Sequence, residues 1–361
     1  MKKYISWIIV AILLSSAGVA VLLMRDSDGS RSWKKAQNML VDGQYVEAME
    51  ELEKAASKGH VEAITMLGDI HAKAQRGKNL KLARSRYLQA AKLGYADAQS
   101  KLADCYLRGL GTSTNPDKAV KWLRKAAEQD HAAAQYALGD CYMKGIGLSK
   151  DELQALEWYR WAAEQGHADA QYALGECYAN GKGVSRDDTE AAKWYRKAAE
   201  QGHAQAQSDL GLYYKLGLGG LQENHTEAVK WYRRAAEQGY AQAQSRLGDC
   251  YEFGKGVPQD NVEAARWHQK SAEQGDAHAQ FMLGMSYYLG KGVPKSYEKA
   301  ASWFRRAAEQ GNESGQYFLG TCYEDGTGVP KDIEEAVKWY QKAAAQGDEM
   351  AIERLRELNV R

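Results

Sequence analysis

The sequence predicts an all-α fold, a right-handed α/α solenoid of helix-turn-helix repeats of about 36 residues, preceded by one transmembrane helix. Three regularities predict the repeats. A residue that caps helix N-termini stands seven positions before each recurring tryptophan, and a glycine closes nearly every repeat. The tryptophans recur every 36 residues, with one step of 37, at Trp122, Trp158, Trp194, Trp231, Trp267, Trp303 and Trp339.

The first 24 residues have the composition of a membrane helix. The run from Tyr4 to Met24 holds 21 residues without a charge, which as a helix is long enough to cross ~30 Å of hydrocarbon. A cleaved signal peptide is the alternative, with Gly18 and Ala20 as the small residues before a cut. Because the apolar run continues past Ala20, we expect residues 1–24 to form an uncleaved signal-anchor.

The charges that flank this run indicate its orientation. Lys2 and Lys3 favour a cytoplasmic N-terminus, although Arg25 and Arg31 follow the run. Since such a short tail usually stays inside, we expect a single-pass protein of the inner membrane with a cytoplasmic tail and a soluble domain in the periplasm. Residues 25–32 are polar and lack an apolar period, so we expect a flexible tether there.

The first helix of each repeat is typified by residues 168–184. Ala170, Leu174 and Tyr178 fall at i, i+4 and i+8 and form one stripe of a helix. A glycine inside a helix costs about 1 kcal/mol, so Gly175 predicts the close approach of another backbone. Gly181 and Gly183 are expected to end the helix through positive φ angles.

The second helix begins at a recognisable cap. The seven expected N-cap residues are Asn115, Asp151, Asp187, Asn224, Asp260, Ser296 and Asp332. Three positions later, acidic or amide residues predict capping boxes, at Gln154, Glu190, Glu227, Glu263 and Glu335. Ala191, Trp194 and Ala198 are expected on one buried face, and Gly202 as the residue that follows the helix. Asp130 is the lone substitute for that glycine.

The order of these motifs resembles the Sel-one-like repeat (SLR) family, a branch of the tetratricopeptide-type helical repeat proteins. The residues that carry the resemblance follow the patterns A-x-x-x-L-G-x-x-Y, G-x-G-V and D-x-x-x-A-x-x-W-Y-x-K-A-A-x-x-G. Seven such repeats cover residues 96–348, and residues 33–95 are similar to one tetratricopeptide-like and one degenerate repeat. Residues 349–361 are expected to form the polar capping helix that the end of a solenoid requires.

No group of residues in the chain predicts catalysis, a cofactor or a metal site. Cys105, Cys141, Cys177, Cys250 and Cys322 recur at one repeat position, about 10 Å apart, which is too far for disulfides, so we expect small apolar fillers. Some secreted members of the resembled family pair two cysteines per repeat, whereas this chain has one. His60, His131, His167 and His203 are expected to be polar turn residues. The 48 basic and 47 acidic residues nearly cancel, which argues against nucleic acid as a partner.

The repeats differ most on the face that the resemblance implies is concave. In most repeats the residues projecting there are polar or small, but the repeat after Gly275 is apolar throughout. We predict a partner-binding patch, since apolar groups on a wet face indicate an interaction site, formed by Phe281, Met282, Met285, Tyr288, Leu289, Leu212, Leu216, Phe253, Tyr317 and Phe318. The alternative is internal packing between the repeats.

The chain is therefore expected to be a membrane-anchored, non-enzymatic scaffold or adaptor that presents its repeats to a protein partner, with no small-molecule substrate. The tryptophans are expected to serve packing, and Trp161 is an additional one that we expect to be exposed. Two alternatives remain open. Secreted relatives imply a weak β-lactamase-like hydrolase activity, and an envelope location is compatible with binding of cell-wall glycans or of the enzymes that remodel them.

Overall fold

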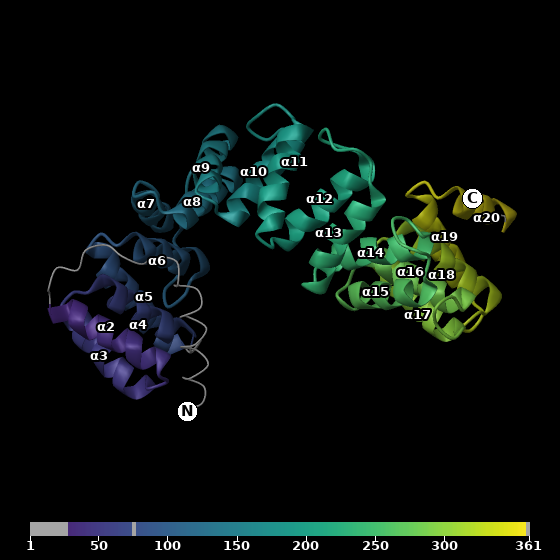
Figure 1. The fold of residues 1–361 in the computed structure, drawn as a ribbon. Coiled ribbons are helices and arrows are strands. Elements are labelled where there is room, and N and C mark those ends of the chain that lie inside the picture. Colours follow the sequence, from purple (N-terminus) through teal and green to yellow (C-terminus); the bar gives the residue numbers. More distant parts are fainter. Residues whose placement is uncertain (1–27, 74–76, 359–361) are drawn as a thin grey trace. The chain divides into compact units, whose positions relative to one another are not determined.

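The computed structural model describes residues 28–73 and 77–358, and these residues form 19 α-helices and no β-strand (Figure 1). The all-helical repeat architecture that the period predicts is confirmed. The expected cytoplasmic tail and transmembrane helix lie outside the described residues. The chain divides into two compact units, Met1–Cys177 with Gly181–Ser185, and Tyr178–Asn180 with Arg186–Arg361.

Within each unit, helices that are neighbours along the chain pack on one another (Figure 1). The helices of the N-terminal unit, which includes all but the end of α10, are α2 (Asp28–Val41), α3 (Tyr45–Ser57), α4 (Val61–Lys73), α5 (Gly77–Lys92), α6 (Ala96–Arg108), α7 (Pro116–Ala127), α8 (Ala132–Lys144), α9 (Glu152–Glu164) and α10 (Ala168–Asn180). Those of the C-terminal unit are α11 (Asp188–Glu200), α12 (Ala204–Leu216), α13 (His225–Glu237), α14 (Ala241–Phe253), α15 (Asn261–Glu273), α16 (Ala277–Leu289), α17 (Tyr297–Glu309), α18 (Glu313–Asp325), α19 (Ile333–Ala344) and α20 (Glu349–Glu357). From α6 onward, even-numbered helices are the first helices of the repeats and odd-numbered helices are the second.

Both ends of the described chain are helical. α2 begins at Asp28, inside the segment 25–32 that was expected to be a flexible tether. α2 packs on the rest of the unit through the buried Ala36 and Leu40, and the ring of Trp33 lies 5.3 Å from that of His60 in the turn after α3. At the other end, α20 forms where a capping helix was predicted, with Ala351 buried and charged residues around it.

All seven predicted N-caps are confirmed, but the prediction that they form capping boxes is wrong. The side chain of Asp187, for example, accepts hydrogen bonds from the backbone N–H groups of Thr189 and Glu190. A capping box would also need Glu190 to accept from the backbone N–H of Asp187. That N–H instead donates to the carbonyl of Tyr178 at 3.0 Å, and Glu190 pairs with Lys193 at 2.6 Å. The cap therefore ties the second helix to the first.

The glycine inside first helices such as α8 and α18 makes room mainly for a ring, and in α8 also for a backbone carbonyl, since a Cβ on Gly139 would lie 3.2 Å from the carbonyl oxygen of Ala155. A Cβ added to Gly139 would lie 2.7 Å from the ring of Tyr159, and one on Gly320 would lie 2.6 Å from the ring of Tyr340. An even closer backbone approach occurs at the turn after the helix. There Gly147 has φ +69°, and its Cβ would lie 2.6 Å from the carbonyl carbon of Pro116.

The buried face of the second helix is centred on the residue after the repeat tryptophan. Tyr195 is 2% exposed, whereas Trp194, which the sequence placed on that face, is half-buried. The ammonium group of Lys197 lies 3.8 Å from the ring centre of Trp194. Trp231, Trp267 and Trp339 are buried, whereas the other repeat tryptophans are half-buried at the edge of the core. In six of the seven repeats a basic residue of the same helix lies over the ring.

A buried glutamine joins each repeat to its neighbour. Gln135 is 2% exposed, and its Nε2 donates to the carbonyl of Ala127 at 3.3 Å. Its Oε1 accepts from Nε2 of Gln165 at 2.7 Å. The same arrangement recurs at Gln207, Gln244, Gln280 and Gln316 in the C-terminal unit. Because a buried amide costs free energy unless its hydrogen bonds are made, this contact explains why both glutamines recur.

Candidate functional site

The ten residues of the predicted partner-binding patch lie in the C-terminal unit, on four first helices. α12 carries Leu212 and Leu216, α14 carries Phe253, and α18 carries Tyr317 and Phe318. The other five residues lie on α16. Of these, Met282 is only 8% exposed, Leu289 is 47% exposed, and Phe281, Met285 and Tyr288 are half-buried.

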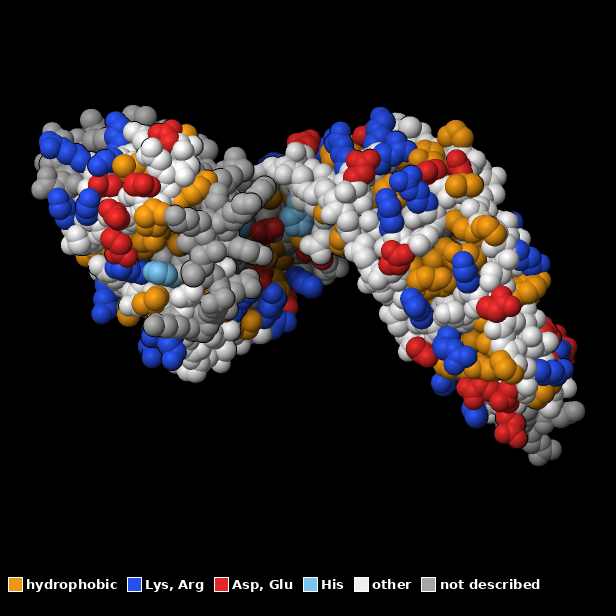
Figure 2. All heavy atoms as spheres, turned by 90° about the horizontal axis from the view of Figure 1, so that it is seen from below, with side chains coloured by type: hydrophobic (Ala, Val, Ile, Leu, Met, Phe, Trp, Pro, Cys, Tyr) orange, Lys and Arg blue, Asp and Glu red, His pale blue; other side chains and the backbone are white. Residues whose placement is uncertain are grey.

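Three of the ten form an exposed row at one helix position. Leu216, Phe253 and Leu289 are the last residues of α12, α14 and α16, and their exposed fractions are 54%, 59% and 47%. The four other repeats of residues 96–348 hold polar or charged residues at this position, namely Arg108, Lys144, Asn180 and Asp325. We name these three residues the apolar row. Figure 2 shows apolar side chains in patches on one face of the C-terminal unit, between basic and acidic groups.

A second group is an aromatic cluster built around Phe304 of α17. The ring of Phe281 lies 5.9 Å from that of Phe304 and 5.6 Å from that of Phe318. Tyr288 lies 6.3 Å from Phe304, and Tyr317 lies 5.4 Å from Phe318. Burial raises the pKa of the Tyr288 hydroxyl. These residues are partly internal packing, the alternative that the sequence left open, and their outer edges remain accessible.

The aromatic cluster exists because two polar partners are replaced together. In the repeat of α8 and α9, the hydroxyl of Tyr159 donates to Asp140 at 2.7 Å. The equivalent residues of α17 and α16 are Phe304 and Met285, which cannot form this hydrogen bond. Sequence reasoning missed Phe304, although its place after the repeat tryptophan, where tyrosine is usual, was a visible signal.

Leu212 shows the cost of replacing only one of the two partners. It occupies on α12 the position that Asp140 holds on α8. The tyrosine remains on α13, and the hydroxyl oxygen of Tyr232 is buried with no hydrogen-bond partner among the described residues. An unsatisfied buried hydroxyl is unfavourable by about 1–3 kcal/mol. The fold therefore tolerates a destabilising apolar residue at this surface.

Two small hollows lie beside the apolar row. One of about 150 Å³ is lined by Glu252 of α14, Lys291 and four α16 residues of the predicted patch. Another of about 140 Å³ includes Phe253, Lys215 and Lys255 in its lining. The apolar row is thus bordered by shallow depressions with charged groups at their edges, as in the polar rim of a protein interface.

The five cysteines are buried, and three of the histidines cap helices. Burial raises the pKa of the thiols to about 11 for Cys105, Cys141 and Cys250 and to about 12 for Cys177 and Cys322, which disfavours the reactive thiolate. His131, His167 and His203 are N-caps of the first helices, since each Nδ1 accepts from a backbone N–H. In the part of the chain that the structure describes, no cluster of three or more His, Cys, Asp or Glu residues could hold a metal ion.

Comparison with protein families identifies these repeats. The Sel1 repeat model matches seven consecutive segments, residues 96–131, 132–167, 168–203, 204–240, 241–276, 277–312 and 314–348. The chain belongs to the Sel1 repeat family. The matched segments coincide with the seven repeats that the tryptophan spacing predicts. Comparison with curated proteins gives no match.

Two solved structures share the Sel1 repeat fold of this chain. The structure of a protective antigen of uropathogenic Escherichia coli with an SLR fold is 38% identical, with a TM-score of 0.76, over 86% of this chain and 67% of that one. A Sel1 repeat protein of Oxalobacter formigenes is 33% identical, with a TM-score of 0.61, over 97% of this chain and 99% of that one. Sel1 repeats are a protein–protein interaction fold, and the chain has this fold. None of the described helices is both long and apolar enough to cross a membrane.

Proposed function

We propose that this Sel1 repeat protein is a membrane-anchored, non-enzymatic scaffold that binds a protein partner through the C-terminal unit. The observation that carries the proposal is the apolar row, because three consecutive repeats expose a large apolar side chain where the other four have a polar or charged one. Equivalent residues of stacked repeats lie about 10 Å apart. The row therefore offers evenly spaced contacts to one extended partner segment.

The chemistry of this surface suits a partner with apolar side chains. Covering a large exposed apolar side chain is favourable by about 1.5–3 kcal/mol when burial is complete, and Leu216, Phe253 and Leu289 are about half exposed. Met285 and the accessible edges of Phe281 and Tyr288 extend the contact area on α16. Methionine and aromatic side chains adapt their packing to a partner, which favours an apolar peptide or helix face over a glycan.

Photo-crosslinking tests whether the apolar row contacts a protein. A p-benzoylphenylalanine residue at Phe253 should form a discrete crosslinked product in membranes, because the row faces the partner. The same residue at Lys144, the matched position of α8, is the control and should give no such product. Equal crosslinking at both positions, or none at Phe253, would contradict the proposal.

The anchor is part of the same proposal. The uncharged run from Tyr4 to Met24 is long enough to span a bilayer, and the basic tail before it favours a cytoplasmic N-terminus. A reporter that is active only outside the cytoplasm, fused after Arg361, should be active, and the mature chain should begin before Tyr4. An N-terminus near residue 21 would contradict the anchor, and an inactive reporter would contradict the periplasmic location.

A further inference from the structure

Trp161 stands where each of the six other repeats has a basic residue that packs on the repeat tryptophan. Three positions after the repeat tryptophan the other repeats have a lysine or arginine, whose charged group lies over the indole ring. The six pairs are Lys125 on Trp122 at 4.8 Å, Lys197 on Trp194 at 3.8 Å, Arg234 on Trp231 at 4.5 Å, Lys270 on Trp267 at 4.0 Å, Arg306 on Trp303 at 4.4 Å and Lys342 on Trp339 at 3.7 Å. In α9 this position holds Trp161, so the cation is missing from its usual place.

The two tryptophans of α9 form an open aromatic corner. The ring centres of Trp158 and Trp161 are 4.6 Å apart, with their planes at 90°. Trp161 is 46% exposed, as the sequence led us to expect. Among the described residues, no lysine or arginine lies over either ring. The exposed ring of Trp161 is therefore available to a group from outside.

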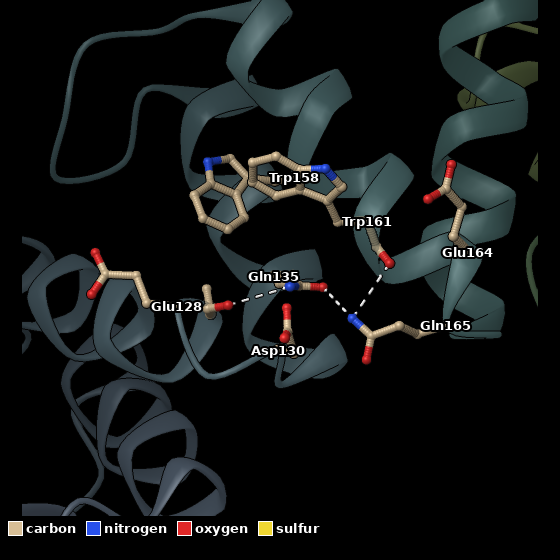
Figure 3. A pocket seen from close by; sticks show the side chains of 8 residues that line it. Glu128, Asp130, Gln135, Trp158, Trp161, Glu164 and Gln165 are labelled. Atoms are coloured by element: carbon tan, nitrogen blue, oxygen red, sulfur yellow. Dashed lines mark hydrogen bonds between the residues drawn. The ribbon is translucent and has the colours of Figure 1, made fainter.

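This corner borders a hollow of about 700 Å³ in the N-terminal unit. Its lining residues come from the ends of α7 and α9 and the start of α8, and they are Ala127, Glu128, Asp130, Gln135, Trp158, Trp161, Glu164 and Gln165. In the view of Figure 3 the two indole rings lie above the hydrogen bond between Gln165 and Gln135, and Asp130 lies below it. Three of the eight residues are acidic and none is basic, which gives the hollow a negative character.

The three carboxylates have no internal partner. Glu128, Asp130 and Glu164 are exposed, and within the described residues none of them forms an ion pair or a side-chain hydrogen bond. Elsewhere on the surface acidic residues are often paired, as Glu190 is with Lys193. The negative charge beside the aromatic corner is thus uncompensated and attracts a cation.

Asp130 is the second departure from the repeat in the same hollow. It has φ +58°, the only positive φ of a non-glycine residue in the described chain. The matched residues of the later repeats are glycines with positive φ, such as Gly166 and Gly202. An aspartate costs more than glycine in this left-handed conformation. Both substitutions that are peculiar to this region, Asp130 and Trp161, therefore line one cavity, one adding negative charge and the other removing a positive charge.

We propose that this hollow, which we name the Trp158–Trp161 hollow, binds an arginine side chain of a protein partner. A guanidinium group stacks on an indole face and donates hydrogen bonds to carboxylates, so it fits both features of the lining. The volume of about 700 Å³ accommodates the arginine together with the adjoining residues of its chain. The site lies in the N-terminal unit and is separate from the apolar row.

The test is a titration of the full-length chain with a short peptide that contains two arginines. Binding is monitored through the ¹⁵N resonances of the tryptophan indole N–H groups. We expect the Trp161 resonance, assigned by its loss in the Trp161→Lys variant, to shift with the peptide. The same peptide with citrulline in place of arginine keeps the shape without the charge and should not bind. Tetramethylammonium tests whether any small cation suffices, and it should bind at least about tenfold more weakly than the arginine peptide.

Two variants restore the repeat and therefore preserve the fold. Trp161→Lys places an internal cation over Trp158, as in the six other repeats, and should reduce peptide affinity at least about tenfold. Asp130→Gly removes the strain of an aspartate in the left-handed conformation, so it should raise the unfolding temperature. It should also lower the affinity for the peptide several-fold, because it removes a carboxylate from the hollow. The proposal is overturned if the peptide leaves the Trp161 resonance unchanged, if the citrulline peptide or tetramethylammonium binds as well as the arginine peptide, or if Trp161→Lys binds as tightly as the native chain.

Discussion

Gln165 donates a hydrogen bond of 2.7 Å to Gln135, whose own amide group donates to the carbonyl of Ala127. One buried side chain thus connects two consecutive second helices, α7 and α9, through the first helix between them. Because the glutamine recurs in each of the seven repeats, this contact is a main determinant of how the repeats stack.

The first prediction concerns this contact. Gln135→Leu should lower the free energy of unfolding by about 1–3 kcal/mol, since it removes a buried amide and leaves its partners unsatisfied. In a solenoid the loss should be local, with faster hydrogen exchange in α7, α8 and α9. Chemical denaturation and hydrogen exchange measure the two effects. Equal acceleration of exchange along the whole chain would contradict a nearest-neighbour role.

The second prediction separates the cap from the capping box. Asp187→Ala removes the two hydrogen bonds that the cap accepts and should cost about 1 kcal/mol. Glu190→Ala should cost at most about 0.5 kcal/mol, because Glu190 forms only an exposed pair with Lys193. Denaturation of the two variants side by side measures the difference. Equal losses would indicate that the capping box forms after all.

The third prediction concerns the replaced polar pair of α16 and α17. Phe304→Tyr alone should destabilise the chain by about 1–3 kcal/mol, because the new hydroxyl is buried without an acceptor. Adding Met285→Asp recreates the pair of Tyr159 and Asp140 and should recover about 1 kcal/mol or more. A double-mutant cycle measures this coupling. Strictly additive effects would show that the two positions are independent.

The fourth prediction is a pH dependence in the C-terminal unit. His278 of α16 lies 3.1 Å from Asp249 of α14, and this hydrogen bond raises the pKa of the imidazole against the opposing effect of burial. Glu252 of α14, His268 of α15 and Asp276 are the other titratable groups near this pair. A raised pKa in the folded state stabilises the fold fully below the unfolded value of about 6.5, and this stabilisation is lost as the pH rises through the folded pKa.

His278→Ala should therefore cost more stability at pH 5.5 than at pH 8.5. The difference should be below about 1 kcal/mol, because the side chain is half exposed and the pair is screened by solvent. Denaturation of the native chain and the variant at both pH values gives the measurement, and His225→Ala on α13 is the histidine control. A cost that is the same at both pH values would contradict the assigned ion pair.

The repeats and their helix caps could be predicted from the sequence because they depend on the preferences of individual residues and their neighbours in the chain. The spacing of Trp158 and Trp194 sets the period, and Asp187 and Gly202 mark helix ends through their own backbone preferences. The ring that fills the space over Gly139, and the glutamine contact between repeats, depend on which residues meet across helices. Periodicity does not reveal this.

The candidate site was only partly predictable for the same reason. The apolar character of α16 was visible, and so was the exposure of Trp161. Leu289 is exposed and Met282 is buried, although both are apolar residues of one helix. The sequence pattern alone did not distinguish them. The role of Phe304 emerges only when its ring is seen among Phe281, Tyr288 and Phe318.

The central claim is that the apolar row binds a protein partner, and one binding measurement tests it most directly. The triple variant Leu216→Arg, Phe253→Lys and Leu289→Asp places at each site a residue that the matched position holds elsewhere in the chain, at Arg108, Lys144 and Asp325. These exposed positions should leave the unfolding temperature nearly unchanged. With the partner identified by crosslinking at Phe253, we predict that calorimetry will show at least about a hundredfold loss of affinity, since apolar contacts become charged. Unchanged affinity in the folded triple variant would contradict the claim.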